Sequence, residues 1–254
     1  MGKIISISNQ KGGVGKTTTA VNLSAALAQR GKKTLLVDMD PQANATGSLG
    51  IKKSIEGTYN LLLGNSVVDD LVVATIQKKL DILPSCVELA GAEIELSSYE
   101  NKEKILKNIL DKIRNKYDYI IIDCPPSLNL LSVNALTASD SVLVPMQCEY
   151  FALEGISQLI YTVNLIKDRL NYSLGIEGIL FTMYDTRTNL GTQVIENVKN
   201  NIDEYIFNSF IPRNIRLAEA PSYGEPINIY DKRSSGAKAY DELAKELIKK
   251  NKKW

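Results

Sequence analysis

Histidine is missing from all 254 residues of the chain. Its absence excludes catalysis by Ser-His-Asp or Cys-His arrangements and removes a common metal ligand. A magnesium site made of hydroxyl, carboxylate, water and phosphate oxygens remains open. Cysteine is scarce, since Cys86, Cys124 and Cys148 are far apart and form no CxxC pair. The sequence therefore favours buried free thiols over a disulfide framework or a zinc knuckle.

The chain also lacks an excess of charge of one sign. Its formal net charge is +1, with 44% hydrophobic and 23% charged residues. A strongly basic domain would by itself indicate nucleic-acid binding, so any contact of this chain with DNA requires a local patch. No apolar run has the length of a transmembrane helix, and Met1–Ser8 does not read as a signal peptide. We expect a soluble, cytoplasmic α/β protein.

Short apolar runs alternate with helical patterns along the chain. The segments expected to form strands are Ile4–Ser8, Thr34–Val37, Ile82–Leu83, Tyr119–Ile122, Val142–Val144, Ile176–Met183 and Ile206–Ile211. The segments expected to form helices are Thr17–Gln29 (stopped by Gly31), Glu88–Ser97, Lys102–Lys116, Leu153–Leu170, Thr192–Ile202 and Ala237–Lys250. This alternation predicts an α/β fold with a doubly wound, mostly parallel sheet. Because no linker or repeat divides the chain, we expect one domain over residues 1–254.

A phosphate-binding loop is predicted where the first strand meets the first helix. Residues 9–18 read NQKGGVGKTT. Glycines let backbone N–H groups approach phosphates closely, and the start of the helix adds its positive end. Lys16 is expected to reach the β- and γ-phosphates, and the Thr17 hydroxyl is expected to ligate magnesium.

The beginning of this loop departs from the ordinary pattern. Gln10 stands where glycine is usual, and an additional lysine, Lys11, follows it. Two lysines near one triphosphate are useful if both neutralise charge in the transition state. Lys11 lies early in the loop, so it serves either its own nucleotide or that of a neighbouring subunit. The second arrangement would make the active enzyme a dimer.

Four segments in the same order resemble motifs of the ParA/MinD ATPases. Residues 11–18 resemble the deviant Walker A loop of these P-loop NTPases, and residues 38–46 (DMDPQANAT) resemble their second motif. Residues 119–126 (YIIIDCPP) resemble the Walker B strand and the switch after it. Residues 213–227 (RNIRLAEAPSYGEPI) resemble the ParA/Soj branch of partitioning ATPases in particular. The resemblance runs over nearly the whole chain.

The resemblance implies roles for four charged residues. It implies an ATP sandwich dimer in which Lys11 crosses to the partner's phosphates. Asp40 would position or activate the attacking water, and Asp123 would hold magnesium through a water. These roles agree with position, because Asp40 follows the second strand at the edge where open α/β sheets bind ligands, and Asp123 follows an apolar run. Asp38 fits loop capping as well as it fits function.

The resemblance also places Pro212 and Asn214 beside the adenine. Pro125-Pro126 is either a rigid turn or a switch that senses the γ-phosphate. The residues expected to contact ATP are Lys11, Gly12, Gly13, Val14, Gly15, Lys16, Thr17, Thr18, Pro212 and Asn214. The expected catalytic residues are Lys11, Lys16 and Asp40, and the expected Mg²⁺ residues are Thr17 and Asp123.

ParA-like proteins bind double-stranded DNA without sequence preference when they are dimeric and hold ATP. The resemblance carries this role to Arg187 and Arg216, and phosphate-directed arginines suit such salt-sensitive binding. The alternative is that each is a solvated or ion-paired surface arginine. The resemblance further implies a nucleoid-associated protein, a centromere-binding ParB-like activator and contact with a replication initiator. We expect no N-terminal helix-turn-helix domain, which larger plasmid relatives carry.

A MinD-like ATPase that cycles on the membrane in cell-division site placement is the main alternative. Its mark would be a basic amphipathic tail, formed by Tyr240, Leu243, Ala244, Leu247 and Ile248 before Lys249–Trp254. The narrow apolar stripe favours a helix packed on the core with a frayed basic end, and no membrane contact. A redox ATPase like the nitrogenase iron protein would need cluster cysteines, which Cys86 and Cys148 do not resemble. Residues 213–227 argue against a small-molecule kinase or ligase of the same fold.

Overall fold

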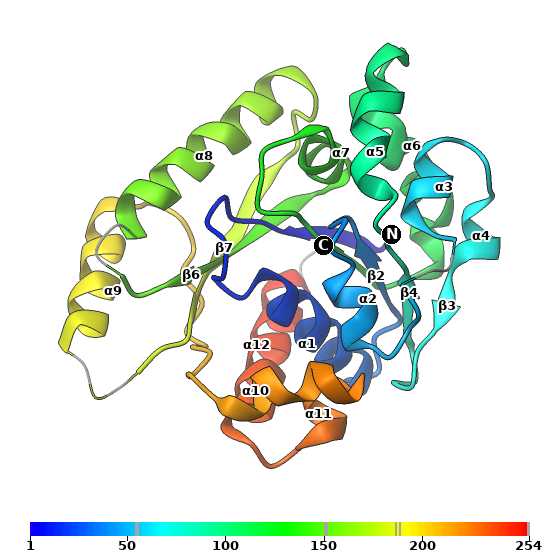
Figure 1. The fold of residues 1–254 in the computed structure, drawn as a ribbon. Coiled ribbons are helices and arrows are strands. Elements are labelled where there is room, and N and C mark those ends of the chain that lie inside the picture. Colours follow the sequence, from blue (N-terminus) through cyan, green and yellow to red (C-terminus); the bar gives the residue numbers. More distant parts are fainter. Residues whose placement is uncertain (54–55, 150–151, 186, 188, 253–254) are drawn as a thin grey trace.

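The computed structural model describes residues 1–53, 56–149, 152–185, 187 and 189–252, and within them the centre is a seven-stranded sheet (Figure 1). The strands are β1 (Lys3–Ile7), β2 (Thr34–Asp38), β3 (Val73–Ala74), β4 (Leu80–Leu83), β5 (Tyr119–Asp123), β6 (Ser141–Gln147) and β7 (Gly175–Thr182). Their order is β3-β4-β2-β5-β1-β6-β7, and β3 alone among them is antiparallel to its neighbour. The predicted doubly wound, mostly parallel fold is confirmed.

Helices cover both faces of this sheet. The described α-helices are α1 (Lys16–Gln29), α2 (Asn44–Ser48), α3 (Thr58–Leu62), α4 (Val68–Leu71), α5 (Leu89–Glu95), α6 (Ile105–Ile113), α7 (Leu130–Ala138), α8 (Ala152–Arg169), α9 (Asn189–Asn201), α10 (Ile215–Glu219), α11 (Ile227–Tyr230) and α12 (Ser235–Asn251). In Figure 1, α1 and α12 lie on one side of the sheet, and α5, α7 and α8 lie on the other. None of the helices in the described ranges is both long and apolar enough to cross a membrane.

The central strand β5 shows why an unbroken apolar run forms a strand here. Ile121 packs into the core beneath α1 and α12, whereas Ile120 and Ile122 pack into the core beneath α5, α6 and α7. All five residues of β5 are buried, and β5 is hydrogen-bonded between β1 and β2. Because both faces are covered, the strand needs apolar residues at successive positions rather than alternating ones.

The strand predicted over Ile206–Ile211 is wrong. Its first residue bridges Ile179 of β7, and its last residue donates to the same strand, but the middle turns away. The backbone N–H groups of Asn208 and Ser209 donate instead to the Glu246 carboxylate of α12, at 2.8 and 3.0 Å. A charged acceptor therefore replaces the neighbouring strand, and the ladder is interrupted.

The helical layer near β4 also differs from the prediction. The expected helix over Lys102–Lys116 is divided into a 3-10 turn (Lys102–Lys104), α6 and a second 3-10 turn (Arg114–Lys116). Helix α7 was not predicted. Most of its residues are buried, because it packs against α6 and lies close to α8, so its sequence has no polar face to reveal the helical period.

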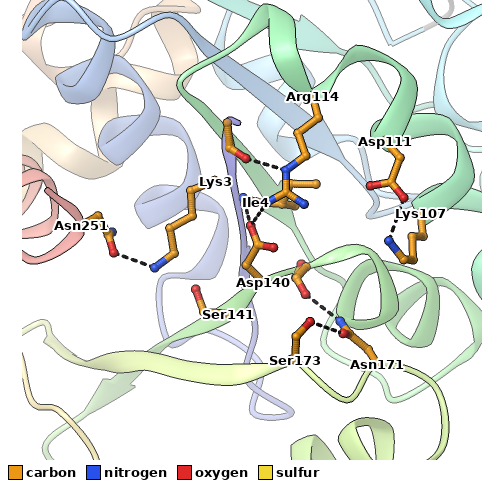
Figure 2. Close-up of polar contacts among 12 residues, drawn as sticks. Lys3, Ile4, Lys107, Asp111, Arg114, Asp140, Ser141, Asn171, Ser173 and Asn251 are labelled. Atoms are coloured by element: carbon orange, nitrogen blue, oxygen red, sulfur yellow. Dashed lines mark hydrogen bonds and ion pairs between the residues drawn. The ribbon is translucent and has the colours of Figure 1, made fainter. Parts of the chain in front are cut away.

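Charged side chains fasten the amino-terminal edge of the sheet. Glu177 of β7 is 1% exposed, and its carboxylate accepts from Lys3 Nζ at 2.5 Å, Lys250 Nζ at 3.1 Å and Ser141 Oγ at 2.6 Å. Lys3 also donates to Asn251 at 2.6 Å (Figure 2). Burial alone would raise the pKa of Glu177, but the bonds from Lys3 and Ser141 bring it below its usual value. The last turn of α12 is thus tied to β1 and β7.

Candidate functional site

The predicted phosphate loop lies between β1 and α1, at the carboxyl edge of the sheet. Gly13 and Gly15 have φ angles of 73° and 88°, in the left-handed region that glycine tolerates, and Gly15 immediately precedes α1. A Cβ atom built on Gly12 or Gly13 would meet no atom within 4 Å, so the loop presents an open backbone surface. Such a surface at the start of a helix suits an anion.

A cavity of about 380 Å³ opens over this loop. It is lined by Gly12, Gly13, Gly15, Lys16, Thr17, Thr18, Asp40, Gln42, Asn44, Pro126 and Met183. The cavity therefore brings together the loop, the carboxyl end of β2 and the turn after β5, three segments that the sequence motifs had singled out. We call it the phosphate cavity.

Lys16 is buried at the edge of the phosphate cavity. Its Nζ donates to the backbone carbonyl of Lys11 at 2.9 Å. Burial lowers the pKa of Lys16, and the nearby carboxylates of Asp123 and Asp40 oppose this effect. Because an ammonium carries three donors, one bond to a carbonyl leaves capacity for phosphate oxygens.

Asp123 ends β5 and is completely buried. Within the described residues, neither of its carboxylate oxygens has a hydrogen-bond partner. Burial, followed by the negative charge of Asp38 at the same register on β2, raises its pKa well above the usual value, while the nearby Thr17 side chain lowers it. A buried carboxylate in this state is costly, and a cation held through water would compensate it.

A metal ion at this position would need ligands from outside the protein. Among the described residues, no group of three or more His, Cys, Asp or Glu side chains could hold a metal by itself. The Thr17 hydroxyl and the Asp123 carboxylate are oxygen donors of the kind that Mg²⁺ prefers, with phosphate and water completing the set. The two residues therefore fit a magnesium ion that arrives with a nucleotide.

Asp38 and Asp40 have separate environments. Asp38 Oδ2 accepts from Thr46 N at 2.8 Å and Thr46 Oγ1 at 2.7 Å, and its Oδ1 accepts from Asp40 N at 3.1 Å. Burial raises the pKa of Asp38 to about 6. Asp40 instead lines the phosphate cavity, and its Oδ1 accepts from Gln42 N at 2.9 Å. Asp38 thus caps the loop, as one of its two interpretations predicted.

A second cavity of about 490 Å³ adjoins the first. It is lined by Gly15, Thr18, Thr182, Met183, Ile211, Pro212, Arg213, Asn214, Ile215, Leu217, Ala218 and Tyr240. The lining is largely apolar with a few polar groups, as is usual for sites that accept a flat organic ring. Pro212 and Asn214, which the resemblance places beside adenine, both lie on its wall. We call it the base cavity.

The side chain of Asn214 is engaged within the protein. Its Oδ1 accepts from Arg216 N at 2.8 Å and caps α10, while its Nδ2 donates to Ser235 Oγ at 2.5 Å. It therefore joins the starts of α10 and α12 at the wall of the base cavity. Its contact with adenine stays a prediction.

Lys11 lies in neither of these two cavities. Its Nζ pairs with the carboxylate of Glu149, and its side chain is 52% exposed. It lines a separate hollow of about 320 Å³, together with Val14 and Met146. The structure therefore does not bring Lys11 to the phosphate cavity that Lys16 lines, and its action on a neighbouring subunit's nucleotide stays a prediction.

The two arginines predicted to bind DNA are on the surface and carry intramolecular ion pairs. Arg187, with 85% of its side chain exposed, pairs with Asp185 at 2.6 Å, and hydrogen bonds from Arg187 hold the pKa of Asp185 well below its usual range. Arg216 pairs with Glu219 at 2.9 Å and Asp231 at 3.7 Å. Their charges are therefore partly balanced within the chain, and their contact with DNA stays a prediction.

Two side chains that the sequence analysis missed hold the phosphate loop from behind. Gln147 Nε2 donates to the Gly13 carbonyl at 2.9 Å, and Thr182 Oγ1 donates to the Val14 carbonyl at 2.8 Å. Both lie at the carboxyl ends of strands, β6 and β7, on the side of β1 away from β5. Gln147 lies three residues after the predicted strand Val142–Val144, and Thr182 lies one residue before the end of the predicted strand Ile176–Met183, so polar residues close to two strand ends were the signal available in the sequence.

The apolar stripe of α12 packs on the core. Of its five residues, Tyr240, Leu243, Ala244 and Leu247 are buried in the cluster that also holds α1, and Ile248 is partly buried against it. This is the packing that the narrow stripe favoured over a bilayer contact. The last two residues of the expected basic tail, Lys253 and Trp254, lie outside the described residues.

A glycine-rich loop between a parallel strand and a helix, with Lys16 and Asp40 on the wall of one cavity, defines a P-loop nucleotide-binding protein. A family model described as an AAA domain matches residues 2–176. The chain is 57% identical over 249 residues to the sporulation initiation inhibitor protein Soj of Bacillus subtilis, covering 97% of this chain and 98% of Soj. The chain belongs to the Soj/ParA family of chromosome-partitioning ATPases.

Two further proteins are similar to this chain, and the first of them is also named as a chromosome partitioning protein. The chromosome partitioning protein ParA of Myxococcus xanthus is 52% identical over 253 residues, covering 99% of this chain and 89% of ParA. A solved structure of cobyrinic acid a,c-diamide synthase from Mycobacterium smegmatis, with bound ADP and magnesium, is 36% identical with a TM-score of 0.87. It covers 98% of this chain and 95% of the synthase. The family and the ATPase activity predicted from the sequence are thereby confirmed.

Proposed function

We propose that the protein is an ATP-driven switch that partitions DNA. In this proposal ATP and Mg²⁺ close two subunits into a dimer, the dimer binds double-stranded DNA without sequence preference, and hydrolysis releases it. The observation that carries the proposal is the pair of adjoining cavities, about 380 and 490 Å³, which meet at Gly15, Thr18 and Met183. One nucleotide could span both, with its triphosphate in the phosphate cavity and its base in the base cavity.

The residues of the phosphate cavity take distinct parts in this function. Lys16 would bind the β- and γ-phosphates, and Thr17 and, through a water, Asp123 would hold Mg²⁺. Asp40 orients the attacking water from the cavity wall. The bound ion supplies neutralisation of phosphate charge. The ADP and magnesium in the synthase of Mycobacterium smegmatis support this assignment.

The position of Lys11 supports the proposed dimerisation. Its exposed side chain lies outside the cavity that its own loop forms. In the dimer it leaves Glu149 and reaches the partner's phosphates, so each phosphate cavity acquires a second lysine only when two subunits meet. The ion pair with Glu149 is exposed on both sides, and such pairs contribute only about 0.2 to 1 kcal/mol, so exchanging it is inexpensive.

DNA binding is assigned to a local patch containing Arg187 and Arg216. Both side chains are exposed, and each exchanges its own carboxylate partner for a DNA phosphate. A nearly neutral chain that presents a few arginines binds DNA modestly and loses this binding as salt rises. Doubling the patch in the dimer makes the affinity depend on ATP.

The cellular setting is proposed from the relatives named for chromosome partitioning. The protein acts in the cytoplasm on the nucleoid, where a centromere-binding ParB-like protein stimulates hydrolysis and a replication initiator is a further partner. A MinD-like membrane cycle is the runner-up. The burial of the α12 stripe argues against it, because the residues that would enter a bilayer are already in the core. The chain is 36% identical to the synthase and 57% identical to Soj. The sequence therefore supports partitioning more strongly than it supports the reaction of the synthase.

The test uses Asp40→Ala, which should bind ATP and dimerise but hydrolyse poorly. Its binding to random-sequence duplex DNA and to anionic liposomes is measured with ATP or ADP at two salt concentrations. We expect salt-sensitive DNA binding with ATP, none with ADP and no liposome binding. Asp168→Ala, which removes an exposed carboxylate from α8 outside both cavities, should hydrolyse and bind as the unaltered protein does.

Two outcomes would count against the proposal. Liposome binding without DNA binding would transfer the protein to the membrane-cycling branch. Equal DNA binding with ATP and ADP would show that the nucleotide does not control DNA binding. Lys11→Ala separates the steps, because it should retain nucleotide binding as a monomer and fail to dimerise, as measured by sedimentation with ATP.

A further inference from the structure

Met183 occupies the corner where the phosphate cavity meets the base cavity. Three residues line both cavities, namely Gly15, Thr18 and Met183. Gly15 has no side chain, and Thr18 belongs to the first turn of α1. Met183 is therefore the large apolar side chain at the junction, and it is 42% exposed.

The backbone of Met183 is held in a costly conformation. Its φ angle is 50°, in the left-handed region, which unbranched apolar residues rarely adopt. Strained positions of this kind persist where surrounding contacts impose them, and they gather at functional sites. Here the turn comes directly after β7, and Met183 lines both the phosphate cavity and the base cavity from it.

Gln147 connects Met183 to the phosphate loop. Its Nε2 donates both to the Met183 sulfur and to the Gly13 carbonyl, each at 2.9 Å. Thr182, the residue before Met183, donates to the Val14 carbonyl at 2.8 Å. These hydrogen bonds therefore fix the position of Met183 relative to the phosphate loop.

We infer that Met183 is a nucleoside-contacting residue, which packs against the ribose and the inner edge of the base and sets their position relative to the phosphates. This assignment rests on the proposed ATP site. A nucleotide that spans both cavities must pass their shared corner, and an apolar, polarisable thioether suits the face of a sugar and a base. Met183 therefore contributes to binding of the nucleoside part and not to binding of the phosphate chain.

The experiment compares ATP and ADP with inorganic tripolyphosphate, which fills the phosphate cavity alone. Met183→Gly removes the side chain and relieves the backbone strain, and Met183→Asn keeps a side chain that tolerates this backbone but is polar. Met183→Leu is the conservative variant. Asn101→Gly is the matched control, since Asn101 has a φ of 53° and lies outside both cavities. Dissociation constants are measured by calorimetry, and unfolding temperatures by circular dichroism.

We expect the Gly and Asn variants to weaken ATP and ADP by about tenfold, the Leu variant by less than about threefold, and tripolyphosphate to stay within about twofold throughout. The unfolding temperature of Met183→Gly should not fall, because strain is relieved, as in Asn101→Gly. A variant that folds stably yet binds its nucleotide poorly distinguishes a contact from a structural support.

Two results would overturn the inference. One is unchanged ATP affinity in Met183→Gly and Met183→Asn. The other is a parallel loss of ATP and tripolyphosphate, which would make Met183 a support of the loop. If the unaltered protein bound neither ATP nor tripolyphosphate, the proposed function itself would be wrong, and this assignment would fall with it.

Discussion

Substitution of Glu177 tests what stabilises the fold, independently of the nucleotide site. The change Glu177→Gln keeps the shape of the side chain and removes its charge. Lys3, 13% exposed at its side chain, and Lys250, 29% exposed, then lose the carboxylate that they share. Breaking a buried ion pair by removing one partner costs about 3 to 5 kcal/mol, because the remaining charge is uncompensated. That is a large part of a typical folding free energy of about 5 to 15 kcal/mol.

The assay is equilibrium unfolding in urea, with Glu196→Gln as the control. Glu196 is exposed on α9, so its substitution should stay within about 0.5 kcal/mol. Nucleotide affinity should not change, because Glu177 lies at the amino edge of the sheet and the phosphate loop at the carboxyl edge, and distant sites do not couple. The substitution thus separates stability from function.

Acid provides the second half of the Glu177 test. The pKa of Glu177 is lowered in the folded protein from its ordinary 4.5, since the Lys3 and Ser141 bonds outweigh burial. Its stabilising contribution is therefore complete above the unfolded-state pKa and is lost as pH falls through the folded-state value. The free-energy gap between the two proteins should narrow below pH 4.5. The unaltered protein and Glu177→Gln should differ in unfolding free energy by about 3 to 5 kcal/mol at neutral pH. A difference under about 1 kcal/mol, or a difference that grows as the pH falls, would refute the reasoning.

Three further substitutions test the site. Asp123→Asn should make the nucleotide-free protein more stable by about 1 to 3 kcal/mol at pH 8 and should abolish magnesium-dependent hydrolysis. The gain in stability should be smaller at lower pH, because the raised pKa of Asp123 lets the native carboxyl take up a proton. A loss of stability in urea would contradict this prediction. Tyr240→Phe removes the 3.2 Å bond to Thr19 Oγ1 and should cost about 1 kcal/mol in thermal unfolding, whereas a neutral effect would show the bond to be dispensable. Thr182→Val leaves the Val14 carbonyl without its donor and should weaken ATP about fivefold by calorimetry; unchanged affinity would exclude it as a support of the loop.

The sequence predicted the parts of the fold in which local pattern and tertiary environment agree. Tyr119–Ile122 forms a central strand because its apolar run matches burial on both faces. Ile206–Ile211 is apolar at both ends but has Asn208 and Ser209 between them, and Glu246, from a helix near residue 250, accepts from the backbone N–H groups of these two residues. Helix α7 is covered on most sides and shows no amphipathic period. These outcomes depend on partners distant in sequence, which a local pattern does not contain.

In the candidate site, too, local motifs were recognised in the sequence and contacts between distant residues were not. Most of the loop motif and Asp40 line the phosphate cavity, because adjacent residues of a motif build that environment, whereas Lys11 and Val14 line a separate hollow. Gln147 and Met183 were not recognised, because the bond from Gln147 to Gly13 crosses 134 residues of chain, and the bond that ties Met183 to Gln147 crosses 36. The outward position of Lys11 was open in the sequence, since it depends on where Glu149 lies after folding.

The bond between Lys3 and Asn251 joins side chains separated by 248 positions in sequence, at 2.6 Å. The chain is therefore almost a closed ring at the edge farthest from the phosphate loop. A short flexible linker between its ends would leave the sheet order intact, and new ends could be opened at the exposed Gly64–Asn65 turn between α3 and α4. Such a circular permutant would carry a fluorescent reporter in a turn that lines neither the phosphate cavity nor the base cavity.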